Sequence, residues 1–195
     1  MPRVPGLPPN APRTGTAFGR WFGRVVLAAG GWRMRGEFPD LPKMVIIAAP
    51  HSSGWDAVWG LAAKLALGLR VSFMAKRELF WWPLGPLLRL LGGVPTDRSG
   101  PRGVVGGIVQ RFTSEAKFWL AIAPEGTRRR VEKWKSGFWH VAEGAGVPVL
   151  CVYFHYPEKV IGIGPAFDTT SDLGADMGRI REFYRPWQGK FRGTV

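Results

Sequence analysis

The sequence predicts a single α/β domain in which a mostly parallel or mixed sheet is flanked by helices. The first observation behind this prediction is that short apolar runs of strand length alternate with helical patterns along the chain. The second is the length of 195 residues, which fits one domain with a core of its own. The third is that no internal repeat and no second domain can be recognised.

The first 16 residues are expected to form a disordered leader. They contain five prolines and no apolar block, so they do not resemble a secretory signal, which needs an apolar h-region. Residues 17–35 are expected to form a basic amphipathic helix that associates with a membrane. Arg20 and Arg24 share one face of this helix, while Phe, Trp and Val side chains supply apolar area. A helix that packs on the domain is an equally good interpretation of this stretch.

The remaining elements follow from apolar periodicity and from the residues that start and stop helices. Strands are predicted at residues 44–49, 71–75, 117–123, 147–154 and 159–164. Helices are predicted at residues 57–67, 103–112 and 137–143, and from Ser171 or Asp172 to about Tyr184. Gly68 stops the first of these helices, and Ser136 is a candidate cap for the third.

Residues 79–93, "LFWWPLGPLLRLLGG", are almost wholly apolar but are interrupted by Pro83 and Pro86. The segment is too short and too interrupted to cross a bilayer, which takes about 20 apolar residues. It is either a buried irregular helix or an apolar lip on the surface, and the paired Trp81 and Trp82 favour the lip.

The charge balance is strongly basic, with 27 Lys and Arg against 14 Asp and Glu, a net charge of +13. Such a surface attracts nucleic acid, an anionic bilayer or phosphorylated ligands. The ten tryptophans suit either a membrane boundary or base stacking. Cys151 lies inside an apolar run, so we expect a buried and unreactive thiol. The three histidines are dispersed, so no metal site is expected.

The stretch "AAPHSSGWDAVWG" places His51 and Asp56 between a predicted strand and a predicted helix. Imidazole takes a proton near neutral pH, and a carboxylate on its other nitrogen fixes the tautomer and stabilises the imidazolium. The two side chains can meet if His51 ends the strand and Asp56 lies in the first helical turn, where Ser52 and Ser53 are candidate caps. Taken alone, the spacing fits a capped loop with a solvated histidine better.

Two further loops carry charged residues that could hold an anion. Arg98 lies in "GGVPTDRSG", where a turn could direct its guanidinium, although a surface Asp–Arg pair is equally plausible. "APEGTRRR" follows an apolar strand and contains Glu125, Gly126, Thr127 and Arg128. Glycine allows close backbone approach, threonine adds a hydroxyl and arginine binds phosphate in a bidentate manner. As an isolated charge run, it would more simply be a solvated face.

In this order and spacing, "HSSGWD", "GGVPTDR", "PEGTR" and "GVPVLCVYF" resemble the four motif blocks of the glycerolipid acyltransferase family, of the 1-acylglycerol-3-phosphate acyltransferase type. The resemblance implies an acyltransferase domain over residues 36–195, with His51 and Asp56 as its catalytic residues. It also implies that Arg98 and residues 125–128 bind a phosphate-bearing acceptor and that Pro148 shapes the acyl-chain region. The chain departs from the family pattern at Pro50, where asparagine is frequent, and at Thr96, where an apolar residue is usual.

The function implied by the resemblance is O-acyl transfer from acyl-CoA or acyl carrier protein to the hydroxyl of a lysophospholipid, in phospholipid biosynthesis. The expected location is the cytoplasmic face of an anionic membrane, peripheral or monotopic, with no cofactor beyond the acyl donor. A different specialised lysolipid acceptor and a lipid ester or thioester hydrolase are the alternatives. A serine hydrolase is disfavoured because Gly-x-Ser-x-Gly is absent, and a nucleic-acid partner because the aromatic residues lie mostly in apolar runs.

Overall fold

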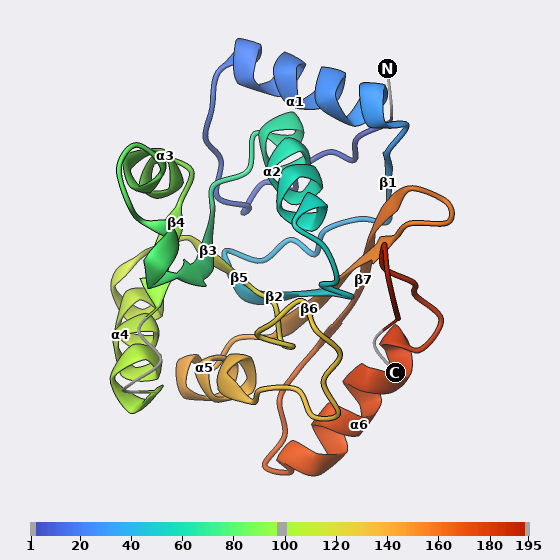
Figure 1. Cartoon of the computed structure of the whole chain (residues 1–195). Coiled ribbons are helices and arrows are strands. Elements are labelled where there is room, and N and C mark those ends of the chain that lie inside the picture. The colour runs from blue at the N-terminus through green and yellow to red at the C-terminus, as the bar shows by residue number, and fades with distance from the viewer. Residues whose placement is uncertain (1–2, 97–100, 194–195) are drawn as a thin grey trace.

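The computed structural model describes residues 3–96 and 101–193, which fold around one mixed sheet (Figure 1). Within these residues, seven strands lie in the order β1-β7-β6-β2-β5-β3-β4. The five neighbouring strands β6, β2, β5, β3 and β4 run parallel. Strand β7 is antiparallel to β6 and parallel to β1. The strands are β1 (Arg33–Arg35), β2 (Lys43–Ala49), β3 (Val71–Lys76), β4 (Gly93–Thr96), β5 (Phe118–Ile122), β6 (Val149–His155) and β7 (Val160–Phe167).

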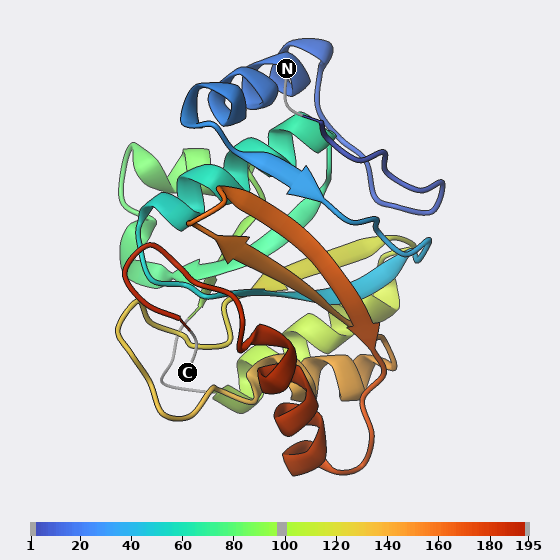
Figure 2. The same ribbon diagram turned by 90° about the vertical axis from the view of Figure 1, so that its right-hand side faces the viewer.

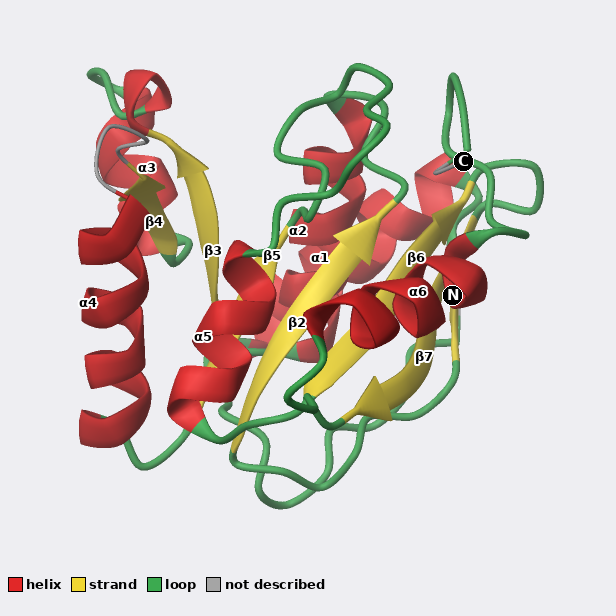
Figure 3. Ribbon diagram, turned by 90° about the horizontal axis from the view of Figure 1, so that it is seen from below, coloured by secondary structure: helices red, strands yellow, loops and turns green. Residues whose placement is uncertain are grey.

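Helices cover both faces of the sheet, as the turned view shows (Figure 2). Helices α1 and α2 lie on one face, and α5 and α6 lie on the other, with α4 packed against α5 (Figure 3). The short helices η1 and α3 precede β4 at the edge of the sheet. The helices are α1 (Ala17–Gly30), α2 (Trp55–Leu67), η1 (Arg77–Leu79), α3 (Leu84–Leu90), α4 (Pro101–Ser114), α5 (Gly137–Ala145) and α6 (Leu173–Tyr184). The predicted α/β class, the five predicted strands and the four predicted helices of the domain are confirmed.

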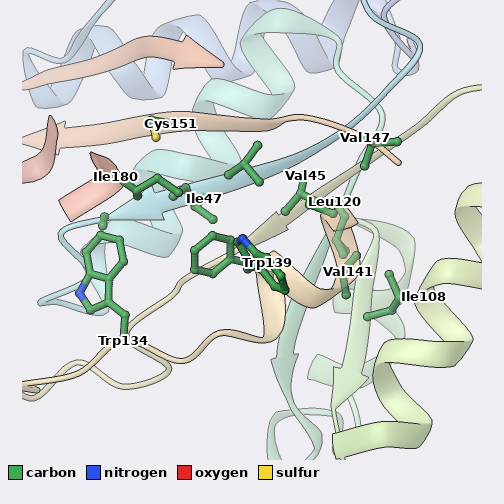
Figure 4. Packing of buried hydrophobic residues seen from close by; sticks show 14 of the residues in the cluster. Val45, Ile47, Ile108, Leu120, Trp134, Trp139, Val141, Val147, Cys151 and Ile180 are labelled. Atoms are coloured by element: carbon green, nitrogen blue, oxygen red, sulfur yellow. The ribbon is translucent and has the colours of Figure 1, made fainter. Parts of the chain in front are cut away.

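Strand β2 is the centre of the fold because apolar side chains leave it toward both faces, as in sheets covered on both sides. Val45 and Ile47 belong to the cluster that α5 and α6 cover, where they lie near Trp139 (Figure 4). Met44 and Ile46 belong to a second cluster on the opposite face. The central strand is therefore held from both sides, and the loop that leaves it starts from a rigid point.

The neighbouring strand β6 holds the single cysteine of the chain in the same core. Cys151 is fully buried, and burial raises the pKa of its thiol to about 12. A thiol in this environment stays protonated at neutral pH and is a poor nucleophile. The expectation of a buried and unreactive thiol agrees with this position.

Helix α1 packs closely on α2 because glycine and alanine line the contact. A Cβ on Gly23 would lie 2.4 Å from the backbone nitrogen of Ala66, so only glycine fits there. The predicted helix over residues 17–35 is too long: it ends at Gly30, where Gly31 adopts a left-handed conformation with φ of 72°. Residues 33–35 form β1 instead, which pairs with β7.

The expected disordered leader is wrong for residues 3–16, which lie against the domain. Ala11 is 1% exposed, and Arg13 forms an antiparallel bridge with Leu69. The Thr14 N–H donates to the carbonyl of Gly68 at 2.9 Å. Prolines favour an extended backbone, and the residues between them keep N–H and C=O groups that pair with the start of β3.

The apolar segment 79–93 lies on the surface and forms α3 between two turns. Trp82 and Leu90 are more than four-fifths exposed, and Trp81 and Leu87 are also exposed. The interpretation of this segment as an apolar lip is therefore confirmed. Within the described part of the chain, no helix is both long enough and apolar enough to cross a membrane.

Candidate functional site

The candidate site lies where β2 and β5 end side by side. These strands are parallel neighbours, and Ile47 of β2 is in register with Ile122 of β5. The loop with His51 and the loop with Glu125 therefore leave the same edge of the sheet, which is where open α/β folds carry their sites. The fold thus brings together two of the motifs predicted from the sequence.

His51 and Asp56 form the predicted pair. Nδ1 of His51 lies 3.2 Å from Oδ2 of Asp56, in the first turn of α2. The Asp56 side chain is 1% exposed, whereas the His51 side chain is 28% exposed. Because Nδ1 faces the carboxylate, Nε2 is the nitrogen that remains for a substrate proton.

The buried carboxylate of Asp56 is held by three further donors. Its Oδ2 accepts from the N–H groups of Ser52 and Ser53 at 2.8 Å each, and its Oδ1 accepts from the Tyr156 hydroxyl at 2.5 Å. Burial alone would raise the pKa of Asp56, but the hydrogen bonds from His51, Tyr156 and Ser53 outweigh it and lower the pKa below its ordinary value. Asp56 is therefore ionised at neutral pH and can stabilise an imidazolium.

The serines cap α2 differently from the expected arrangement. Gly54 occupies the cap position, and it has no side chain that could accept a cap hydrogen bond. The Ser53 hydroxyl accepts from the Trp55 N–H at 3.2 Å, while Asp56 reaches back to the two serine N–H groups. The start of the helix therefore serves to fix the carboxylate.

Glu125 is a buried residue that ties two loops together. Its Oε1 accepts from the His51 N–H at 2.8 Å, and its Oε2 pairs with the guanidinium of Arg192. Arg192 also donates to the carbonyls of His51 at 3.2 Å and Arg129 at 2.8 Å. Burial raises the pKa of Glu125 despite these two partners. With both oxygens engaged, the carboxylate fixes the backbone of His51 in this structure, where we had expected it to contact substrate.

Of the other residues in the Glu125 loop, Arg128 lies beside the start of α2. Gly126 has a φ of 64°, which favours glycine, and the Thr127 hydroxyl accepts from the Arg129 N–H at 3.3 Å. Arg128 is exposed, and its Nη1 lies 3.2 Å from the point where a Cβ on Gly54 would be. Its guanidinium therefore lies beside the loop that carries His51.

One predicted site residue, Pro148, is not brought to this point. The carbonyl of Pro148 accepts from the Val45 N–H at 3.0 Å, which places Pro148 near the start of β2, at the opposite edge of the sheet from His51. Arg98 lies outside the described residues. The structure thus joins His51, Asp56, Glu125 and the residues after it, but separates Pro148 from them.

Two shallow cavities lie beside the start of α2, close to the loop that carries His51. One has a volume of about 390 Å³ and a mostly apolar lining, and the other a volume of about 280 Å³. They share Trp55 and Lys190, whose ammonium lies 5.4 Å from the Trp55 ring centroid. The first is lined by Ser53, Gly54, Trp55, Val58, Lys190 and Phe191. An apolar chain with an anionic group would find both kinds of contact here.

Sequence reasoning missed Tyr156 and Arg192. Tyr156 follows β6, the other parallel neighbour of β2, so its place after a strand end was the only available signal. Arg192 lies in the C-terminal segment, drawn in dark red in Figure 2, more than 60 residues from Glu125 along the chain. No local pattern predicts that contact. Among the described residues, no group of three His, Cys, Asp or Glu side chains could hold a metal ion.

Comparison with known proteins identifies relatives of this chain. A family model described as "Acyltransferase" matches residues 36–155, more than half of the chain. A 1-acyl-sn-glycerol-3-phosphate acyltransferase of Escherichia coli (strain K12) is 29% identical over 154 residues, covering 74% of this chain and 61% of the relative. One of the same name from Streptococcus pneumoniae is 27% identical over 133 residues, covering 65% of this chain and 47% of the relative. The chain thus spans about half to three-fifths of the length of these relatives.

A solved structure has the same fold. The 1-acyl-sn-glycerophosphate (LPA) acyltransferase PlsC from Thermotoga maritima superimposes with a TM-score of 0.59 at 20% identity, covering 85% of this chain and 75% of that one. The motifs that meet at the ends of β2 and β5 lie inside the matched family region. On the strength of that match, the chain belongs to the acyltransferase family.

Proposed function

We propose that this chain transfers a fatty acyl group from a thioester donor, acyl-CoA or acyl carrier protein, to the free hydroxyl of 1-acylglycerol-3-phosphate, in phospholipid biosynthesis. The observation that carries the proposal is the pair of His51 and buried Asp56, 3.2 Å apart at the end of the central strand. The names of the curated relatives supply the acceptor.

The reaction follows from the pair by general base catalysis. Nε2 of His51 takes the proton of the acceptor hydroxyl while the hydroxyl oxygen attacks the thioester carbonyl. The tetrahedral intermediate then expels the donor thiolate, which takes the proton from the imidazolium and leaves as the thiol. The charge of Asp56 stabilises the imidazolium between these steps. The N–H groups of Ser52 and Ser53 are engaged by Asp56, so they do not hold the oxyanion.

The phosphate of the acceptor is assigned to Arg128. Its guanidinium lies beside Gly54, at the positive end of α2, where an anion is favoured. A guanidinium binds phosphate through two parallel hydrogen bonds. Arg98 is assigned the same ligand from its motif alone.

The site is assigned to the cytoplasmic face of an anionic membrane, which the chain contacts peripherally. Phe18, Trp21 and Phe22 of α1 and the lip around Trp82 are exposed aromatic and apolar groups. Such groups, together with a net charge of +13, suit an anionic lipid–water boundary.

The test is an assay of labelled acyl-CoA and acyl carrier protein against a panel of lysolipids in detergent micelles. We expect diacyl product from 1-acylglycerol-3-phosphate and much less from an otherwise identical acceptor without the phosphate. Release of free fatty acid as the sole product would instead identify a hydrolase. Equal use of both acceptors would contradict the phosphate assignment.

A further inference from the structure

A tyrosine far from the sequence motifs contacts the acid of the catalytic pair. Tyr156 lies in the turn between β6 and β7, and its hydroxyl donates to Oδ1 of Asp56 at 2.5 Å. Strand β6 is a parallel neighbour of β2, with Tyr153 in register with Ala49, so both strands deliver residues to the same edge. The residue that follows β6 therefore arrives beside the residue that follows β2.

The surrounding structure fixes this tyrosine from two sides. Its backbone N–H donates to the carbonyl of Gln188 at 2.9 Å. Its ring packs edge-on against Trp32, with 4.8 Å between the ring centroids, and Trp32 is itself buried. The position of the hydroxyl is thus set by the β6–β7 turn and the aromatic cluster, independently of Asp56.

The chemistry of the contact assigns the proton to the tyrosine. Burial and the neighbouring Asp56 charge raise the pKa of Tyr156 far above its ordinary value, so the hydroxyl remains a donor at any working pH. The other oxygen of Asp56 already accepts from His51 and from the N–H groups of Ser52 and Ser53. The Tyr156 hydroxyl is the donor on Oδ1, and it opposes rotation of the carboxylate about its Cβ–Cγ bond.

We propose that Tyr156 is a positioning residue for acyl transfer, which holds the Asp56 carboxylate so that Oδ2 faces Nδ1 of His51. The proposal rests on the proposed function of the pair. A carboxylate free to rotate would spend part of its time with a poorer hydrogen bond to His51, and the imidazolium would be less stabilised. The effect of the hydroxyl belongs to the chemical step, because the hydroxyl contacts Asp56.

The primary test is Tyr156→Phe, which removes the hydroxyl and keeps the ring. We expect kcat to fall about tenfold, as a lost hydrogen bond to a charged group predicts, with the KM of donor and acceptor nearly unchanged. Tyr184→Phe is the matched control, since its hydroxyl donates to the carbonyls of Ile47 and Val152 in the core. That variant should lower the unfolding temperature but keep kcat.

A second comparison shows whether the tyrosine acts through Asp56. Adding Tyr156→Phe to Asp56→Asn should cause little further loss of kcat, because both changes disturb the same interaction. Selective labelling of histidine gives an independent readout: Tyr156→Phe should shift the ring N–H resonance of His51 and leave that of His140 in place. This readout needs only folded protein, so it holds even if the variant is less stable.

The outcomes separate this proposal from the proposed function. A wild-type kcat in Tyr156→Phe would overturn the role of Tyr156. So would a double variant in which the kcat losses of Tyr156→Phe and Asp56→Asn multiply in full. In either case, an inactive His51→Ala would still support the proposed function. An unmoved His51 resonance would overturn it as well. Full activity of His51→Ala would instead remove the proposed function itself.

Discussion

Removing the guanidinium of Arg192 is expected to weaken the whole site from a position outside every motif. The Glu125 side chain is 0% exposed and that of Arg192 is 17% exposed, so Arg192→Ala leaves a carboxylate buried with one partner instead of two. The hydrogen bonds from Arg192 to the carbonyls of His51 and Arg129 are lost as well.

The magnitude follows from the burial of the pair. Breaking a buried ion pair by removing one partner costs about 3–5 kcal/mol. We expect about 3 kcal/mol here, because the partly exposed Arg192 leaves a space that water can enter. For a chain of 195 residues this lowers the unfolding temperature by about 6–12 °C.

The pKa of Glu125 determines how the stability deficit of Arg192→Ala should change with pH. The pKa of Glu125 is already raised by burial, and loss of Arg192 raises it further. A carboxyl group whose pKa is higher in the folded state than in the unfolded state destabilises the fold when it is ionised, above its folded pKa. Below its unfolded pKa, about 4.3, it is protonated in both states and no longer destabilises the fold. The stability deficit of Arg192→Ala should therefore be largest near neutral pH and should shrink on acidification.

The assay is urea unfolding followed by tryptophan fluorescence at neutral and at mildly acidic pH. Arg129→Ala is the matched control, because Arg129 enters the network only through its backbone carbonyl and its side chain is exposed. Equal stability of the two variants, or a deficit in Arg192→Ala that grows on acidification, would refute the reasoning.

Three further predictions concern the acceptor, the membrane and acid stability. Arg128→Lys should raise the acceptor KM in detergent more than Arg130→Lys does, because ammonium cannot make two parallel bonds to phosphate; matching KM values would contradict the phosphate assignment. Flotation with anionic vesicles should weaken with salt and with Trp82→Ala, whereas equal binding to neutral vesicles would exclude electrostatic attraction. Asp176 is buried, yet hydrogen bonds led by the Trp139 indole lower its pKa from 3.8 to about 2. Wild type should therefore lose stability as the pH falls from about 4 to about 2, and Asp176→Asn should lack that loss in acid unfolding curves.

The framework of the fold could be predicted because apolar runs of strand length are local signals. Residues 44–49 and 117–123 became β2 and β5 with nearly the predicted bounds. Strands β1 and β4 were missed because each is shorter than five residues, and β4 contains Gly93 and Pro95, which usually mark loops. The leader was misjudged because its prolines suit an extended packed segment as well as a disordered one.

The centre of the site could be predicted from two loops, but the residues that hold it in place, Tyr156 and Arg192, could not. Four residues separate His51 from Asp56, so the short turn over residues 51–54 brings them together once α2 begins at Trp55. Tyr156 and Arg192 reach the same point through the sheet order and the path of the C-terminal segment. Such long-range contacts leave no periodic pattern in the chain. The burial of Glu125 and its contacts with His51 and Arg192 were invisible for the same reason.

The most direct test of the central claim is the kcat of His51→Ala in detergent micelles with both substrates saturating. Loss of a general base typically lowers turnover on the order of 10²–10⁴-fold, and we expect a loss in this range with the unfolding temperature kept. His140→Ala is the matched control, because His140 lies on α5, outside the site, and packs edge-on against Trp139. It should keep the wild-type kcat. A folded His51→Ala that turns over like His140→Ala would contradict the assignment of His51 as the base.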